Sequence, residues 1–196
     1  MRCFLNLLAP VIALIAGGAC VAALAQSPTY HLGRTPSAEE IRAWNIAISP
    51  SGKELPPGSG TAKEGAPIYV QKCAKCHGPT GTEAKFLHGA LVGGKGTLSS
   101  PRPLRTVGSF WPYATTLWDW INRAMPLYEE GSLSADQVYA LTAFLLYRNE
   151  IIKESDVMDA KSLPKVQMPN RNGFVPARLE DIPDLQKRGC QLGTCP

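Results

Sequence analysis

The sequence predicts an all-α domain, because its patterned segments carry helix-start signals and the stretches between them are rich in glycine and proline. Capping boxes, in which Ser or Thr is followed three residues later by Glu or Gln, occur at Ser37–Glu40, Thr61–Glu64 and Ser134–Gln137. The third box precedes apolar residues at helical spacing that begin with Val138. This last helix should end near Asn149.

The first two boxes organise the N-terminal part of the chain. The first should open a short helix that ends near Trp44, and residues 49–60, which include PPGSG, should form an irregular linker. The box at Thr61 opens a helix that runs into a cysteine motif at Cys73. We therefore predict an N-terminal arm over residues 26–60, followed by the domain itself.

A long loop and a further helix form the middle of the domain. Residues 78–109 contain repeated glycines and prolines, and an ordered loop of this length needs a surface to pack on. A helix should then start at Thr115 or Thr116. It should stop at Met125, because Pro126 disfavours helical geometry in the residue before it.

The segment after the last helix completes the outline of the chain. Residues 150–196 show little periodicity and should form an extended C-terminal arm, which leaves residues 61–149 as the domain. The formal net charge is +4, and the Lys and Arg residues are scattered rather than clustered. Because this pattern lacks a basic patch, no nucleic acid is expected as a partner.

Residues 1–25 have the features of a cleaved export signal. They combine an early positive charge at Arg2 with a long apolar run and the small-residue ending Ala23-Leu24-Ala25. We expect cleavage after Ala25 and location in the periplasm. A lipoprotein processing site at Cys20 and a transmembrane anchor are the alternatives.

The six cysteines fall into three pairs: two in the signal, two in the motif at residue 73, and Cys190 with Cys195 in the tail. In an oxidising compartment the tail pair should close a small disulfide loop. Free redox-active thiols in the tail are the alternative.

The segment Cys73-Ala74-Lys75-Cys76-His77 is a C-x-x-C-H motif, which is typical of covalent haem attachment. Two cysteines about one helical turn apart can bond to the two vinyl groups of one porphyrin, and His77 then supplies the proximal nitrogen to iron. A redox-active cysteine pair or half of a zinc site are the other interpretations, but zinc needs further Cys or His ligands nearby. The motif therefore predicts one covalently bound haem c.

The sixth ligand of the iron decides between electron transfer and catalysis, because a methionine closes the coordination sphere and an open position permits chemistry. Met125, Met158 and Met168 remain after export, and two of them precede proline, so the local sequence does not choose between them. An aromatic cluster just before Met125 should serve as core and haem pocket; it comprises Phe110, Trp111, Tyr113, Trp118 and Trp120. His31 and His88 are expected at the surface.

The order of elements resembles the class I cytochrome c family: an N-terminal helix, C-x-x-C-H, loops, a ligand methionine and a C-terminal helix. This resemblance implies that Met125 is the axial ligand opposite His77. It also implies that Met168 falls in an arm outside the core.

A closer resemblance covers residues 58–176 and includes the strings GSLSADQVYALTAFLLYRNEII and WPYATTLWDWINRAMP, of which WPYATTLWDWINRAMP is specific. These strings resemble the cytochrome subunit of sulfur dehydrogenase, the SoxD type, and of related sulfite dehydrogenases. Some subunits of that type carry two haems, whereas this chain has a single C-x-x-C-H.

The closer resemblance implies a partner subunit with a molybdenum cofactor, which oxidises a sulfur compound and passes electrons to this chain. A downstream cytochrome c or terminal oxidase would receive them. Two other functions stay open. One is a haem enzyme that acts alone, such as a peroxidase or thiosulfate-oxidising cytochrome, and the other is an independent soluble electron shuttle.

Overall fold

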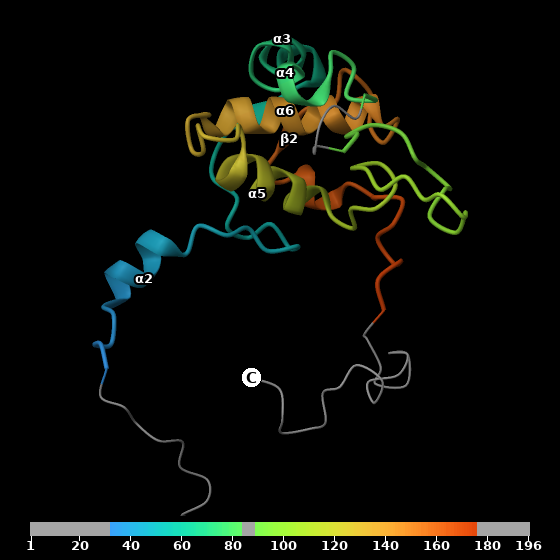
Figure 1. Cartoon of the computed structure of the whole chain (residues 1–196). Coiled ribbons are helices and arrows are strands. Elements are labelled where there is room, and N and C mark those ends of the chain that lie inside the picture. Colours follow the sequence, from blue (N-terminus) through green and yellow to red (C-terminus); the bar gives the residue numbers. More distant parts are fainter. Residues whose placement is uncertain (1–31, 84–88, 176–196) are drawn as a thin grey trace, which may run out of the picture. The chain divides into compact units, whose positions relative to one another are not determined.

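The computed structural model describes residues 32–83 and 89–175 (Figure 1). Its contacts divide the chain into two units, residues 1–44 and 45–196, and each is described by itself. The predicted signal peptide, both surface histidines and the Cys190/Cys195 pair lie outside the described residues. Within the described part, no helix has the length and apolar character needed to cross a membrane.

The described part of the first unit contains helix α2, Ala38–Trp44. The predicted capping box is present, because the Ser37 backbone N–H donates to the Glu40 carboxylate over 2.7 Å and the Glu40 N–H donates to Ser37 Oγ over 3.2 Å. The helix also ends where the sequence predicted. It buries none of its residues.

The second unit is mainly helical (Figure 1). Its helices are α3 (Ala62–Lys72), α4 (Ala74–His77), α5 (Ala114–Ala124) and α6 (Ala135–Arg148), with a short 3₁₀ helix, η1, at Leu163–Lys165. Two-residue strands β1 (Ser59–Gly60) and β2 (Met158–Asp159) pair antiparallel, with Ser59 opposite Asp159.

The helix boundaries follow the predicted local signals. The boxes at Thr61 and Ser134 both form, with the Thr61 N–H donating to Glu64 over 2.8 Å and the Ser134 N–H donating to Gln137 over 2.9 Å. Helix α5 starts one residue before the predicted Thr115 and ends before Met125. Met125 is extended, with φ −128° and ψ 149°, as the following proline requires.

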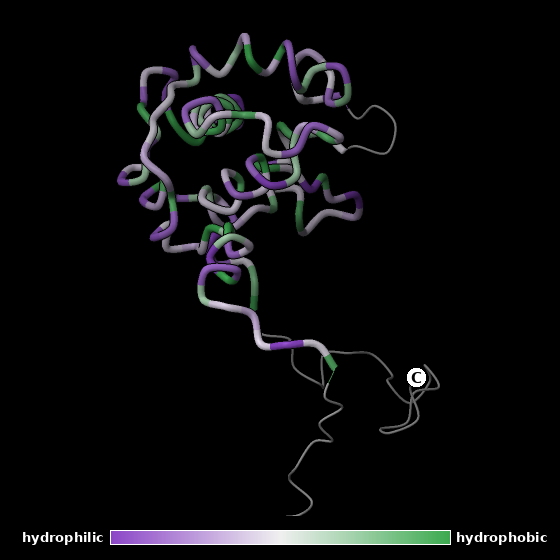
Figure 2. Tube along the Cα trace, turned by 90° about the vertical axis from the view of Figure 1, so that its left-hand side faces the viewer, coloured by the Kyte–Doolittle hydropathy of each residue, from purple (hydrophilic) through white to green (hydrophobic). Residues whose placement is uncertain are grey.

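The centre of this unit is a steep crossing of α3 and α6. Figure 1 shows α3 nearly end-on and α6 lengthwise, and Figure 2, after a quarter turn, shows the reverse, with apolar residues around α6. Gly65 permits this approach, because a Cβ there would lie 2.6 Å from the carbonyl carbon of Ala140. Beside the crossing, the rings of Tyr69 and Phe144 lie 4.9 Å apart. Nine of the fourteen α6 residues, the unbroken run from Val138 to Leu146, are buried, so α6 forms the middle of the core.

The segment after Asn149 contributes to this core. Met158, Leu163, Val166 and Met168 are buried in the same apolar cluster as α6. The expectation that Met168 lies in an arm outside the core is therefore wrong, since only 3% of this residue is exposed. The part of this segment that the structure describes contains β2, η1 and turns, and β2 and η1 are too short to give a periodic signal in sequence.

The predicted loop after His77 has no regular structure in its described part, and Asn149 anchors it. The Asn149 side chain donates to the Leu91 carbonyl over 3.1 Å and accepts from the Gly93 N–H over 3.0 Å. Thr106 and Ser109 add hydrogen bonds within the loop, including Thr106 Oγ1 to the Gly93 carbonyl. The loop is thus tied to the end of α6.

Candidate functional site

The cysteine motif lies where α3 passes into α4. The Cys76 and His77 N–H groups donate to the Cys73 carbonyl over 3.1 and 3.0 Å, so the motif forms a single helical turn. Gly78 ends this turn with φ 79°, and its carbonyl accepts a hydrogen bond from the buried Tyr69 hydroxyl over 3.0 Å. The structure therefore brings both cysteines and His77 together, as the sequence predicted.

The two thiols differ in environment. Cys73 is half-buried and packs against the core, whereas Cys76 is exposed. Burial, followed by the nearby Cys76, raises the pKa of the Cys73 thiol to about 11. A redox-active cysteine needs a lowered thiol pKa, so Cys73 lacks the activation of a thioredoxin-like site. Among residues 32–83 and 89–175, no three His, Cys, Asp or Glu side chains gather in a group that could hold a metal ion.

Met125 caps the C-terminus of α5 and packs, half-buried, against the core. The next residues form a turn in which the Glu129 N–H donates to the Pro126 carbonyl over 2.8 Å. The Glu129 carboxylate pairs with Lys72 Nζ at 2.9 Å. Because Lys72 directly precedes Cys73, this ion pair places the turn after Met125 beside the start of the cysteine motif.

Sequence analysis missed the Lys72–Glu129 pair. The two residues are 57 positions apart, so no helical or turn spacing relates them. The opposite charges of the two residues were the available sequence signal. The chain contains so many acidic and basic residues that opposite charge alone does not identify a pair.

The other two methionines are core residues. Met158 lies in β2 and is 4% exposed, and Met168 is 3% exposed in the same apolar cluster. Flexible thioether side chains commonly fill gaps in cores in this way. Of the three candidates, Met125 is the one that lies at a helix end, next to the cysteine motif.

The predicted aromatic cluster divides into two parts. Trp118 is 2% exposed and packs on Tyr139 of α6, with ring centroids 5.4 Å apart. Trp120 is 49% exposed and meets Trp111 edge to face, with centroids 6.3 Å apart. Trp118 therefore belongs to the core, while Trp111, in the loop before α5, and Trp120, on α5, leave part of their ring surface uncovered.

These features fit a haem. The donor set contains two thiols one turn apart, an imidazole and a thioether, which are the ligand types of haem c proteins. The partly exposed rings of Trp111 and Trp120 supply apolar surface of the kind that a large planar group could cover.

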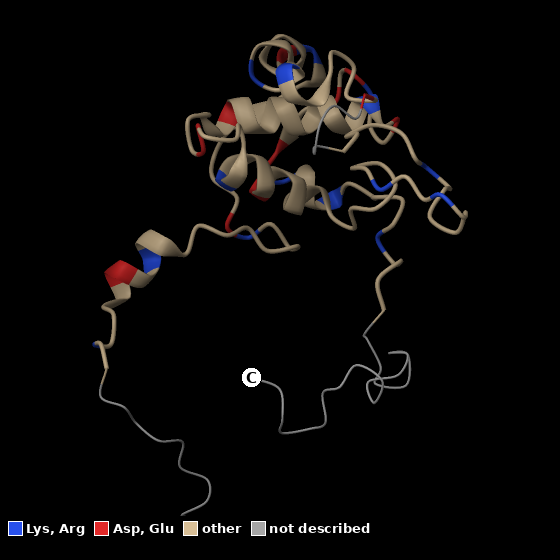
Figure 3. Cartoon of the chain, viewed as in Figure 1, with Lys and Arg blue, Asp and Glu red and all other residues tan. Residues whose placement is uncertain are grey.

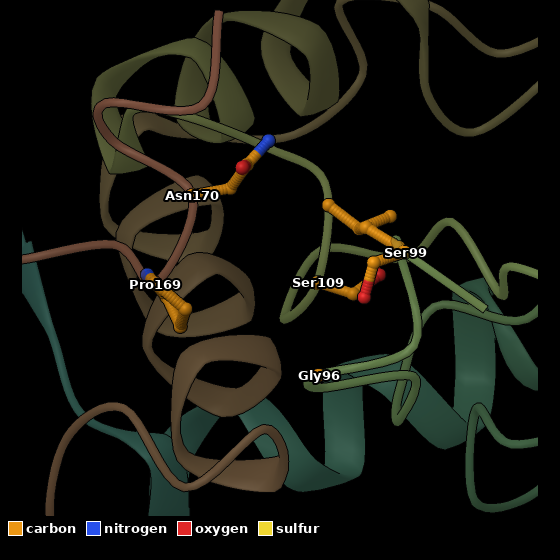
Figure 4. A pocket seen from close by; sticks show the side chains of 6 residues that line it. Gly96, Ser99, Ser109, Pro169 and Asn170 are labelled. Carbon is orange, nitrogen blue, oxygen red and sulfur yellow. The ribbon is translucent and has the colours of Figure 1, made fainter.

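A small pocket elsewhere in the second unit has a different character. It has a volume of about 250 Å³, and Figure 4 shows Ser99 and Ser109 facing Pro169 and Asn170 across it. The polar groups are already engaged, since Ser109 Oγ donates to the Leu104 carbonyl and Asn170 Nδ2 donates to the Phe110 carbonyl. No member of the cysteine motif lines this pocket, so it is not part of the candidate site.

Comparisons with known proteins agree with this geometry. Residues 60–145 match the family described as cytochrome c oxidase, cbb3-type, subunit III. The structure also matches a chain of the sulfane dehydrogenase SoxCD from Paracoccus pantotrophus, with a TM-score of 0.70 and 37% sequence identity. That match covers 86% of this chain and 83% of the other. A search of curated proteins gave no significant match.

The SoxCD match confirms the resemblance to sulfur dehydrogenases that the sequence suggested, and the helical fold confirms the predicted class I cytochrome c architecture. A cytochrome c domain implies haem c and a role in electron transfer. The chain therefore belongs to the cytochrome c family.

Proposed function

We propose that this protein is a periplasmic cytochrome with one haem, which accepts electrons from a molybdenum-dependent sulfur or sulfite dehydrogenase subunit. It then passes them to a downstream cytochrome c or terminal oxidase. The observation that carries the proposal is the match over 86% of the chain to a protein chain solved in the sulfane dehydrogenase SoxCD. The export signal that the sequence of residues 1–25 predicts supports the location.

The residues that would hold the haem follow from the site. Cys73 and Cys76 would form the thioether bonds, and His77 and Met125 would be the axial ligands. When bound, haem iron supplies a one-electron redox change. The sequence contains one C-x-x-C-H motif, which supports one haem per chain.

The protein's own contribution is to keep the two ligand segments in place. The α4 turn fixes His77 relative to both cysteines, and α5 ends so that Met125 leaves the helix in an extended conformation. The Lys72–Glu129 pair joins the two segments. A methionine held in this way favours an electron carrier over a haem enzyme, which needs an open iron position.

Purification of the full chain from its native host tests the proposal. Mass spectrometry should show one haem added to a chain that starts at Gln26, and molybdenum should co-purify in proportion to haem. A reduced sulfur compound should then reduce the haem of the complex. If the purified protein contains no molybdenum and its reduced haem binds carbon monoxide readily, the protein is a separate haem enzyme and the proposal is wrong.

A further inference from the structure

Two segments of the second unit carry basic residues and no acidic ones. Residues 89–118 and 160–175 contain no Asp or Glu, and their cations are Lys95, Arg102, Arg105, Lys161, Lys165 and Arg171. The rest of this unit, within residues 45–83 and 119–159, has seven Lys or Arg and eleven Asp or Glu residues. Figure 3 shows this separation on the loop that leads to α5, which is marked by Lys and Arg alone. The unit thus has a basic part and an acidic remainder.

Contacts around Phe110 join the two basic segments. The guanidinium carbon of Arg105 lies 5.5 Å from the centroid of the Phe110 ring, and the Phe174 ring meets the same ring edge to face with centroids 5.1 Å apart. The Phe110 carbonyl accepts a hydrogen bond from Asn170 over 2.8 Å, and Arg171 is the next residue. Arg105 and Arg171 therefore lie close together, although they are far apart in sequence.

The loop before α5 brings two further cations to this place. The Leu104 N–H donates to Thr97 Oγ1 over 3.0 Å, so the loop folds back on itself. Lys95 and Arg102 each lie two residues from a member of this hydrogen bond. The pocket described above opens between this loop and residues 169–170 (Figure 4). We call this surface the basic face; its cations are Lys95, Arg102, Arg105 and Arg171.

The cations of the basic face are available to a partner. Lys95, Arg102 and Arg105 are exposed and Arg171 is half-buried. None of the four forms an ion pair with an acidic residue whose position the structure describes. Arg105 stacks on Phe110, and the guanidinium carbon of Arg171 lies 5.3 Å from the centroid of the Tyr113 ring. Stacking holds a guanidinium in place while its N–H groups can still donate to a carboxylate.

We propose that the basic face is the surface on which this cytochrome reversibly docks an acidic protein that accepts its electrons. The inference rests on the proposed function and names the chemistry of the downstream partner. Three of the four cations are arginines, and they lie beside aromatic rings that include Phe174, which is 54% exposed. Arginine and aromatic residues are enriched in protein–protein interfaces, where lysine is depleted, so this composition favours a protein over a lipid surface.

The exposure of these charges favours a transient partner over the permanent molybdenum subunit. Permanent interfaces are large and apolar, whereas transient electron-transfer contacts are small, and complementary charge speeds their formation. The acidic remainder of the unit adds to this effect, because an uneven charge distribution orients an approaching acidic protein toward the basic face. An acceptor that must leave after each electron transfer needs this kind of contact.

The experiment follows oxidation of the full haem-loaded chain, reduced with dithionite, in a stopped-flow mixer. The probes are two soluble c-type cytochromes, one with a strongly negative and one with a strongly positive net charge. The rate constant of the wild type should fall with ionic strength for the acidic probe and rise for the basic one. Arg105→Gln and Arg171→Gln should each slow the acidic probe about 1.4-fold to 5-fold at low ionic strength. At high ionic strength both variants should match the wild type, because salt screens the attraction.

Lys63→Gln is the matched control, because it removes one positive charge from an exposed residue of α3, outside the basic face. It should react with the acidic probe nearly as fast as the wild type, and Arg105→Lys should keep most of the wild-type rate. Equal slowing by Lys63→Gln and the arginine variants would show an effect of net charge alone and overturn the proposal. So would slowing that persists at high ionic strength, which would reflect a changed reduction potential.

Three other outcomes would assign the basic face to a different occupant and also overturn the proposal. Loss of molybdenum from the arginine variants, purified from the native host, would assign it to the molybdenum subunit. Sedimentation with phosphatidylglycerol vesicles that the arginine variants lose would assign it to a membrane. An arginine effect that appears only after Glu180→Gln, Asp181→Asn and Asp184→Asn would assign it to the chain's own acidic tail. Absence of molybdenum from the wild type would refute the proposed function alone, because the probe reaction does not need the molybdenum subunit.

Discussion

The Lys72–Glu129 ion pair gives a quantitative test of how the ligand segments are held. Lys72→Met and Glu129→Gln each break the pair, whose side chains are 34% and 57% exposed. Exposed pairs of this kind contribute about 0.2–1 kcal/mol. If that free energy holds the turn after Met125 against the cysteine motif, its loss should favour displacement of the Met125 sulfur about 1.4-fold to 5-fold, because 1.4 kcal/mol corresponds to tenfold.

The assay is titration of the oxidised protein with imidazole, followed by loss of the sulfur-to-iron charge-transfer absorption. Both variants should bind imidazole more tightly. Their reduction potentials should move in opposite directions, because removal of a positive charge stabilises the oxidised iron and removal of a negative charge destabilises it. The charge-swapped double variant, Lys72→Glu with Glu129→Lys, should recover most of the wild-type imidazole affinity.

Lys75→Met is the control, since this exposed residue has no ion pair within the described part of the chain. It should lower the potential without changing imidazole affinity. If the two single variants instead change imidazole affinity in opposite directions, as their potentials do, the effect is electrostatic and the pair does not brace the turn. Unchanged imidazole affinity in both single variants would likewise show that the ion pair does not brace the turn.

Three further predictions concern the core and the ligand. Met125→Ala should abolish the sulfur-to-iron absorption of the oxidised protein, whereas Met168→Ala should keep the band and instead lower the free energy of unfolding by about 2–5 kcal/mol; the opposite pattern would make Met168 the ligand. Gly65→Ala should cost about 1–3 kcal/mol or more in denaturant unfolding, because the added methyl overlaps the α6 backbone, while Gly89→Ala, with no atom within 4 Å of its Cβ, should cost little. Burial raises the pKa of Tyr69 to about 12, above its value of about 10 in the unfolded chain. Its contribution to stability is therefore complete below pH 10 and is lost as the pH rises toward 12, so Tyr69→Phe should flatten the decline in unfolding free energy over that range; an equally steep decline would contradict this.

Local chemistry explains why much of the fold could be predicted. Each capping box depends on four consecutive residues, and the Thr61 and Ser134 boxes form as the sequence indicated. The end of α5 follows from Pro126 alone. The C-x-x-C-H motif occupies a single helical turn, so its geometry is also set locally.

The features that sequence analysis missed depend on residues far apart in the chain. β1 and β2 pair across about a hundred residues, and each has two residues, too few for an alternating pattern. Burial of Met168 depends on which surface the final segment covers, and a methionine before proline gives no sign of it. The choice between Met125 and Met168 thus stayed open in the local sequence, whereas core packing of Met168 favours Met125.

The close approach of Gly65 to Ala140 also has a consequence for the order in which the chain folds. These residues are 75 positions apart, and the stretch between them contains the cysteine motif, the long loop and Met125. Their contact closes a large loop, which makes folding slow compared with the formation of the individual helices. A nascent chain that lacks α6 has no partner for this face of α3, so the core forms only after nearly the whole domain has been synthesised.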